Sequence, residues 1–71
     1  MKPLLFREVT RKLEAAGFTA QGQTGSHVKF AKTTAAGTRT ATVPKHHEVA
    51  PGTLRSILRQ AGLSADEFDA L

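Results

Sequence analysis

The chain has 71 residues and no cysteine, with ten Lys and Arg against six Asp and Glu, which gives a formal net charge of +4. A chain of this length has room for one small core, so we expect a single domain over residues 1–71. The lack of cysteine excludes a disulfide framework and a thiolate metal site, and it favours a reducing compartment, with the cytoplasm as the default. The apolar run before Arg7 has only three residues, which is too short for a signal peptide or a membrane span.

The charge is unevenly distributed along the chain. All ten Lys and Arg lie within residues 1–63, together with three acids, so this part carries a net +7. Residues 64–71 contain three acids and no base. A basic body suggests a polyanionic partner, either nucleic acid or an acidic protein.

The first predicted element is an amphipathic helix between Pro3 and Gly17. Its apolar residues recur at spacings of three and four: Leu5, Val9, Leu13 and Ala16. Pro3 suits the first turn of a helix, where its missing N–H would be unpaired in any case. Gly17 supplies the left-handed residue that commonly ends a helix.

Three short segments with strand character follow, at residues 18–21, 27–32 and 38–43. The connections between them are short and contain glycine, so we predict a three-stranded antiparallel meander. Side chains alternate between the faces of a strand, so Val28 and Phe30 should point one way and His27 and Lys29 the other. Pro44 ends the third strand because it cannot donate to the ladder.

A second amphipathic helix is predicted over residues 51–63, with Pro51 at its start and Gly62 at its stop. Ser64 and Glu67 then have the spacing of a capping box that opens a short terminal helix. The order predicts an α+β fold in which two helices cover one face of the sheet and leave the other open. The expected core is Leu5, Val9, Leu13, Phe18, Val28, Phe30, Val43, Leu54, Ile57 and Leu58.

The chemistry-bearing residues form no nucleophile-and-base pair. The segment "KHHE" at residues 45–48 has two histidines and a carboxylate, which are possible metal ligands. Its histidines are adjacent, whereas helical zinc motifs space them four apart, so we expect no metal. What remains is a basic cluster expected on the sheet and the loop after it: His27, Lys29, Lys32, Arg39, Lys45 and His46. A histidine among cations can move a proton at an RNA backbone, where the 2′-hydroxyl is the nucleophile. A non-catalytic RNA-binding module, or a subunit that docks an acidic partner, would fit the same surface.

Three motifs, in order and over nearly the whole chain, resemble the HicA family of bacterial toxins. They are Gly25-Ser26-His27, then Val43-Pro44 with His46, then Gly52–Leu54 followed by Gln60–Leu63. The resemblance implies a double-stranded-RNA-binding-domain-like α-β-β-β-α fold and a metal- and cofactor-independent endoribonuclease that cleaves mRNA. It implies His27 as the catalytic residue and a HicB-type antitoxin as partner in a hetero-oligomer.

The remaining site residues are assigned less specifically. Lys29, Lys32, Arg39 and Lys45 are the candidates to bind RNA. His46 matches a family position, where it either contacts RNA or makes a structural hydrogen bond. His47 falls outside the recognised pattern and is given no role.

Overall fold

The computed structural model describes all 71 residues and confirms the α-β-β-β-α order. Its elements are β1 (Leu4–Leu5), α1 (Phe6–Ala15), β2 (Thr19–Thr24), β3 (His27–Thr34), β4 (Gly37–Pro44), β5 (Glu48–Val49), α2 (Pro51–Ala61) and α3 (Ala65–Asp69). Strands β2, β3 and β4 form one antiparallel sheet in that order, and β1 pairs with β5 in a separate two-stranded sheet. The fold is therefore α+β and double-stranded-RNA-binding-domain-like.

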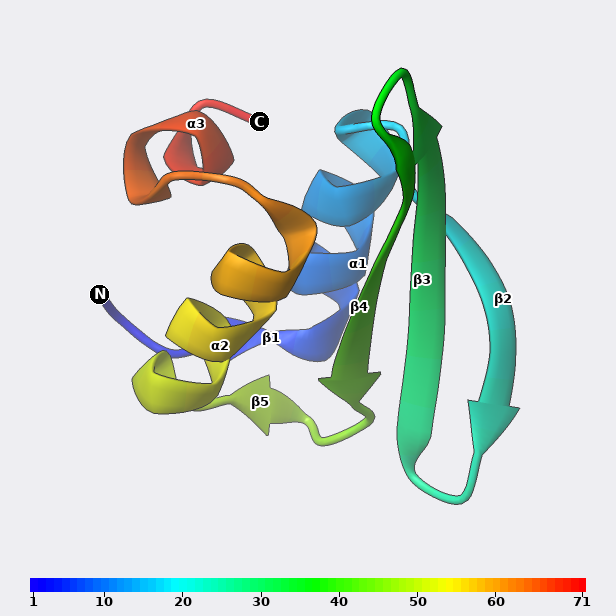
Figure 1. The fold of residues 1–71 in the computed structure, drawn as a ribbon. Helices are drawn as coiled ribbons and strands as arrows, with labels where there is room; N and C mark the ends of the chain where they lie inside the picture. The colour runs from blue at the N-terminus through cyan, green and yellow to red at the C-terminus, as the bar shows by residue number, and fades with distance from the viewer.

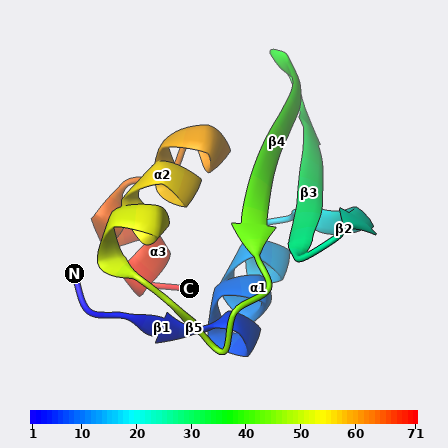
Figure 2. The ribbon, with the colours of Figure 1, turned by 90° about the horizontal axis from the view of Figure 1, so that it is seen from below.

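The helices lie on one side of the three-stranded sheet, as Figures 1 and 2 show. The other side of β3 and β4 is covered by no further element. None of the three helices combines the length and the apolar character that crossing a bilayer requires. The sheet therefore has a packed face and an open face.

The core is one cluster between the sheet and the helices. Val28 and Phe30 of β3 contribute to it from the packed face. Its thirteen buried side chains are Val9, Leu13, Phe18, Val28, Phe30, Ala41, Val43, Val49, Leu54, Ile57, Leu58, Ala61 and Phe68. Nine of the ten core residues predicted from the sequence are among them, and no polar side chain is buried.

The prediction was wrong at the amino terminus. The first helix begins at Phe6, so Pro3 lies before it and not in its first turn. Leu5 is extended and pairs with Glu48, while Leu4 pairs with Val49, and Leu5 is only half-buried. The backbone N–H of Phe6 donates to the carbonyl of His47 at 3.0 Å. Pairing with a distant segment therefore overrides the helical periodicity of the first residues.

Both predicted glycine stops are confirmed. Gly17 follows α1 with a φ of 99°, and Gly62 ends α2 with a φ of 74°. These are left-handed conformations that residues with a side chain rarely adopt. The two helix ends are thus fixed by local sequence.

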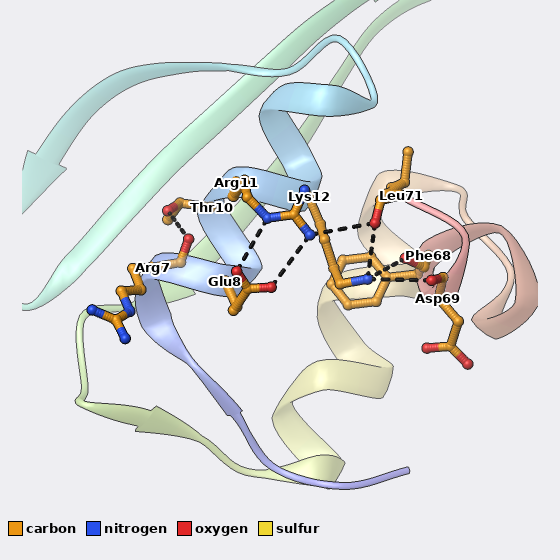
Figure 3. Close-up of polar contacts among 8 residues, drawn as sticks. All are labelled: Arg7, Glu8, Thr10, Arg11, Lys12, Phe68, Asp69 and Leu71. Atoms are coloured by element: carbon orange, nitrogen blue, oxygen red, sulfur yellow. Dashed lines mark hydrogen bonds and ion pairs between the residues drawn. The ribbon is translucent and has the colours of Figure 1, made fainter.

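The short helix α3 is capped and anchored as a unit. Ser64 accepts from the N–H of Glu67 at 3.0 Å, and Glu67 accepts from the N–H of Ser64 at 2.8 Å, so the predicted capping box is confirmed. Phe68 is completely buried. The Lys12 ammonium donates to the carbonyl of Phe68 at 3.0 Å and lies 5.2 Å from its ring centroid (Figure 3). One α1 side chain therefore holds the end of α3.

Candidate functional site

His27 and Lys29 lie on the open face of the sheet. In the strand pairing, His27 is opposite Thr24 and Pro44, and Lys29 is opposite Gly22 and Thr42. Directly paired residues share a face, and neighbours along a strand do not. Val28 and Phe30 are 9% and 2% exposed on the packed face, whereas His27 and Lys29 are exposed. The alternation predicted for this strand is confirmed.

A hollow of about 520 Å³ surrounds these two side chains. We call it the sheet hollow, and its lining residues are Gln21, Gly22, Gln23, Thr24, His27, Lys29 and Thr42. None of them is acidic or apolar. The sheet hollow therefore presents a histidine and one cation in a neutral polar surround, which suits an anionic ligand.

The shape of the sheet hollow comes from an irregularity in β2. The register shifts between Ala20 and Gly22, so Gln21 is an extra residue on this edge strand. Gly22 lies opposite Lys29 and has no side chain, and the space where a Cβ would stand is open. The sequence predicts that the first strand ends at residue 21 and that residues 22–24 lie in a loop, so it does not predict that these residues lie beside His27.

The reactive side chains of the sheet hollow are free of partners within the chain. The amide of Gln21 donates to Thr19 Oγ1 at 2.9 Å, and that of Gln23 donates to the carbonyl of Gly25 at 2.8 Å. These bonds leave the His27 ring unengaged. The one ion pair of the protein joins Arg11 to Glu8 at 3.1 Å, so the Lys29 ammonium is also unpaired. Both groups can meet a ligand without first breaking an internal contact.

Lys32 and Arg39 are not part of this arrangement, which corrects the single basic cluster expected from the sequence. They are opposite each other in the β3–β4 pairing, on the same face as Val28 and Phe30. Lys32 Nζ lies 5.9 Å from the ring centroid of Phe18 and packs beside Gly17. Lys32 lies on the other face from Lys29 because the two residues are three apart on one strand, and only residues an even number apart share a face.

Arg39 lies at the end of α2. A Cβ built on Gly62 would be 2.7 Å from the Cζ atom of Arg39 and 2.8 Å from its Nη2. The guanidinium is thus packed on the C-terminal cap of the helix, where the backbone carbonyls favour a cation. Lys32 has the corresponding position at the end of α1. Both cations therefore have a structural position on the helix side of the sheet.

Lys45 and His46 line a second hollow, of about 420 Å³, next to the start of β3. We call it the loop hollow, and its lining residues are Leu5, Phe6, Arg7, Lys45, His46 and His47. The backbone N–H of Lys45 donates to the carbonyl of Ser26, which ties this loop to the residue before His27. No three His, Cys, Asp or Glu side chains are grouped as metal ligands, the "KHHE" segment included.

Comparison with known families decides the identity of the chain. The model of the family described as "HicA toxin of bacterial toxin-antitoxin" matches residues 6–63. The chain belongs to the HicA toxin family. It is therefore a toxin of a bacterial toxin–antitoxin system, and its partner in that system is an antitoxin. No curated protein matches the chain at a significant level.

The HicA match covers all of the sheet hollow and all of the loop hollow except Leu5, but not the whole structure. It begins with α1 and ends just after Gly62, so it contains His27, Lys29, Lys45 and His46. Strand β1 and helix α3 lie outside it. The residues that the structure gathers on the open face and in the loop after β4 therefore fall within the family's own segment.

Proposed function

We propose that this toxin is an endoribonuclease that cleaves mRNA, that His27 transfers a proton in the reaction, and that a HicB-type antitoxin neutralises it. The observation that carries the proposal is the sheet hollow. An exposed histidine and an exposed, unpaired lysine lie side by side on the open face of the sheet, with no acid lining the space around them. Membership of a toxin family adds to this support.

The reaction needs no nucleophile from the protein. The 2′-oxygen of the RNA attacks the neighbouring phosphorus, and the bond from phosphorus to the 5′-oxygen breaks, which leaves a 2′,3′-cyclic phosphate and a 5′-hydroxyl. One proton leaves the 2′-hydroxyl and one reaches the 5′-oxygen. His27 makes one of these two transfers, because imidazole gains and loses a proton near neutral pH. Lys29 offsets the charge that develops on the phosphoryl oxygens.

The other candidate RNA-binding residues separate by position. Lys45 and His46 lie in the loop hollow beside the start of β3 and can contact RNA that crosses the open face. Lys32 and Arg39 lie on the helix side, so we propose no contact with the reacting phosphate for them.

The test is cleavage of a synthetic RNA by purified protein. His27→Ala should lower the rate by about 10²–10⁴-fold, the usual contribution of a positioned acid or base. Its stability should change by less than about 0.5 kcal/mol, because the side chain is exposed and supports no core contact. Thr40→Ala is the matched control, since Thr40 is exposed and opposite Ala31 on the same open face.

Two further conditions define the chemistry. Cleavage should persist in EDTA and should fail on a substrate whose 2′-hydroxyls are replaced by hydrogen. A folded His27→Ala protein that cuts RNA at the wild-type rate would refute the role of His27. Wild-type protein that binds RNA and never cuts it would instead identify a non-catalytic RNA-binding module.

For the antitoxin, we propose an acidic surface that covers the His27–Lys29 face. A basic toxin attracts RNA through counterion release, so an effective inhibitor has to compete at the same surface. Association should slow as salt is added, and Lys29→Glu should weaken it. Amide exchange that shows protection only on α3, with the open face still binding RNA, would contradict this mode of inhibition.

A further inference from the structure

We propose that the loop hollow binds a phosphate of a nucleotide that flanks the cleavage position. This inference rests on the proposed function, since it assigns a second contact site for the same RNA. It gives roles to Arg7 and His47. The sequence assigned neither residue to a site.

The composition of the loop hollow points to an anion. Four of its six lining residues carry basic side chains: Arg7, Lys45, His46 and His47. None of the six is acidic. Glu8, the acid next to Arg7 in sequence, is held by Arg11 through two hydrogen bonds of 3.1 and 3.2 Å. Neither the Arg7 guanidinium nor the Lys45 ammonium forms an ion pair within the chain.

A phosphate group matches these donors best. Guanidinium presents paired N–H donors that fit two phosphate oxygens, and an ammonium adds a compact charge. The imidazoles of His46 and His47 supply further ring N–H donors. Leu5 and Phe6 form the apolar part of the lining, which suits the sugar or base that accompanies a nucleotide phosphate.

The position of the loop hollow favours a flanking nucleotide over an unrelated anion. His27 is opposite Pro44, and directly opposed Cα atoms in an antiparallel pair lie about 4.5–5.5 Å apart. Lys45 is the next residue, about 3.8 Å further along the chain. A strand of RNA whose scissile phosphate lies at His27 therefore reaches Lys45 within a short run of nucleotides.

The long-range pairing of β1 with β5 creates this site. It places the first residues of α1 beside the loop that follows β4, and the hydrogen bond from Phe6 to His47 fixes the contact at 3.0 Å. Arg7 thereby joins a loop nearly forty residues away in sequence. The two hollows together extend the proposed RNA contact from the open face of the sheet to the first residues of α1.

The experiment measures binding and does not depend on catalysis. In a His27→Ala background, which prevents cleavage if the proposed function is right, anisotropy of a labelled unstructured RNA decanucleotide gives Kd as a function of salt. Arg7→Ala and His47→Gln should each raise Kd by about 5–10-fold, which corresponds to the net contribution of one hydrogen bond. Arg7→Ala should also reduce the slope of log Kd against log salt concentration by about 0.7, the value for one single-strand phosphate contact.

Arg59→Ala is the matched control, because Arg59 is an exposed arginine in the last turn of α2 and lines neither hollow. It removes the same charge and should leave Kd and the salt slope near those of the parent. Circular dichroism confirms that each variant is folded. If Arg7→Ala and His47→Gln bind like Arg59→Ala, the flanking site is refuted.

The two proposals fail separately. Wild-type protein that cuts RNA while the Arg7 and His47 variants bind like the control overturns the flanking site and leaves the nuclease intact. Selective loss of binding in these variants, in a protein that never cuts RNA, supports the phosphate site and refutes the nuclease.

Discussion

Substitution of Gly62 by alanine tests whether Arg39 stabilises the fold or contacts RNA. Gly62 has a φ of 74°, and placing an L-residue in this region costs about 1–2 kcal/mol. The new Cβ would also lie 2.7 Å from Arg39 Cζ, which is closer than real Cβ contacts come. The guanidinium must therefore move, and the cation at the end of α2 is lost, which costs about 0.3–1 kcal/mol.

A double-mutant cycle separates these two contributions. Arg39→Ala alone should lower the free energy of unfolding by about 0.3–1 kcal/mol. With Arg39 already removed, Gly62→Ala should cost only the backbone strain of about 1–2 kcal/mol. The loss in free energy of unfolding of the double variant should therefore be smaller than the sum of the two single losses. The difference equals the contribution of the guanidinium, about 0.3–1 kcal/mol.

Urea unfolding of the four proteins gives the cycle, and RNA binding of Arg39→Ala gives the functional half. Lys29→Ala is the comparison, since Lys29 is a cation on the adjacent strand β3 and its side chain lies on the open face. We expect Arg39→Ala to lose less RNA affinity than Lys29→Ala. Strictly additive stabilities, together with equal losses of RNA affinity, would refute the structural role of Arg39.

Three other changes test the packing, the sheet hollow and the cap of α3. Leu58→Ala removes a core side chain that is 5% exposed and should cost about 2–5 kcal/mol in urea unfolding, and a loss below about 1 kcal/mol would contradict the placement of α2. Gly22→Val should raise stability by up to about 1 kcal/mol, because the space for a side chain is open in an edge strand, yet it should slow RNA cleavage by filling the sheet hollow opposite Lys29. The pKa of Glu67 lies below its ordinary 4.5, mainly because its carboxylate accepts a hydrogen bond from the backbone N–H of Ser64. The ionised carboxylate therefore stabilises α3 fully above about pH 4.5, and this stabilisation is lost as the pH falls through the folded-state pKa. An NMR titration of α3 amides should show this loss in the wild type and not in Glu67→Gln, which keeps an acceptor at the cap; equal titrations in both proteins would contradict it.

Features set by local rules were predictable from the sequence. The stops at Gly17 and Gly62 follow from the preference of glycine for a left-handed conformation, and the Ser64–Glu67 cap follows from its spacing. The open face of β3 follows from alternation at His27 and Lys29. Each of these depends on residues no more than four positions apart.

Features set by distant contacts were not predictable in the same way. Leu4 and Leu5 fit a helical pattern as well as a strand, and only the pairing with Glu48 and Val49 decides between them. The loop hollow depends on that pairing, so Arg7 carried no signal of its own. The grouping of Lys32 and Arg39 with His27 was different, because the parity of the strand positions already assigns them to the other face.

The two faces of β3 explain why changes at the candidate site should separate activity from stability. Val28 and Phe30 supply the buried side chains of this strand, and the backbone pairing with β2 and β4 holds its course. His27 and Lys29 add neither a buried contact nor an ion pair. All six residues of β2 are exposed as well, so the wall of the sheet hollow is held by backbone pairing and not by core side chains. A small domain with one core can therefore vary the chemistry of its open face while the opposite face keeps the fold.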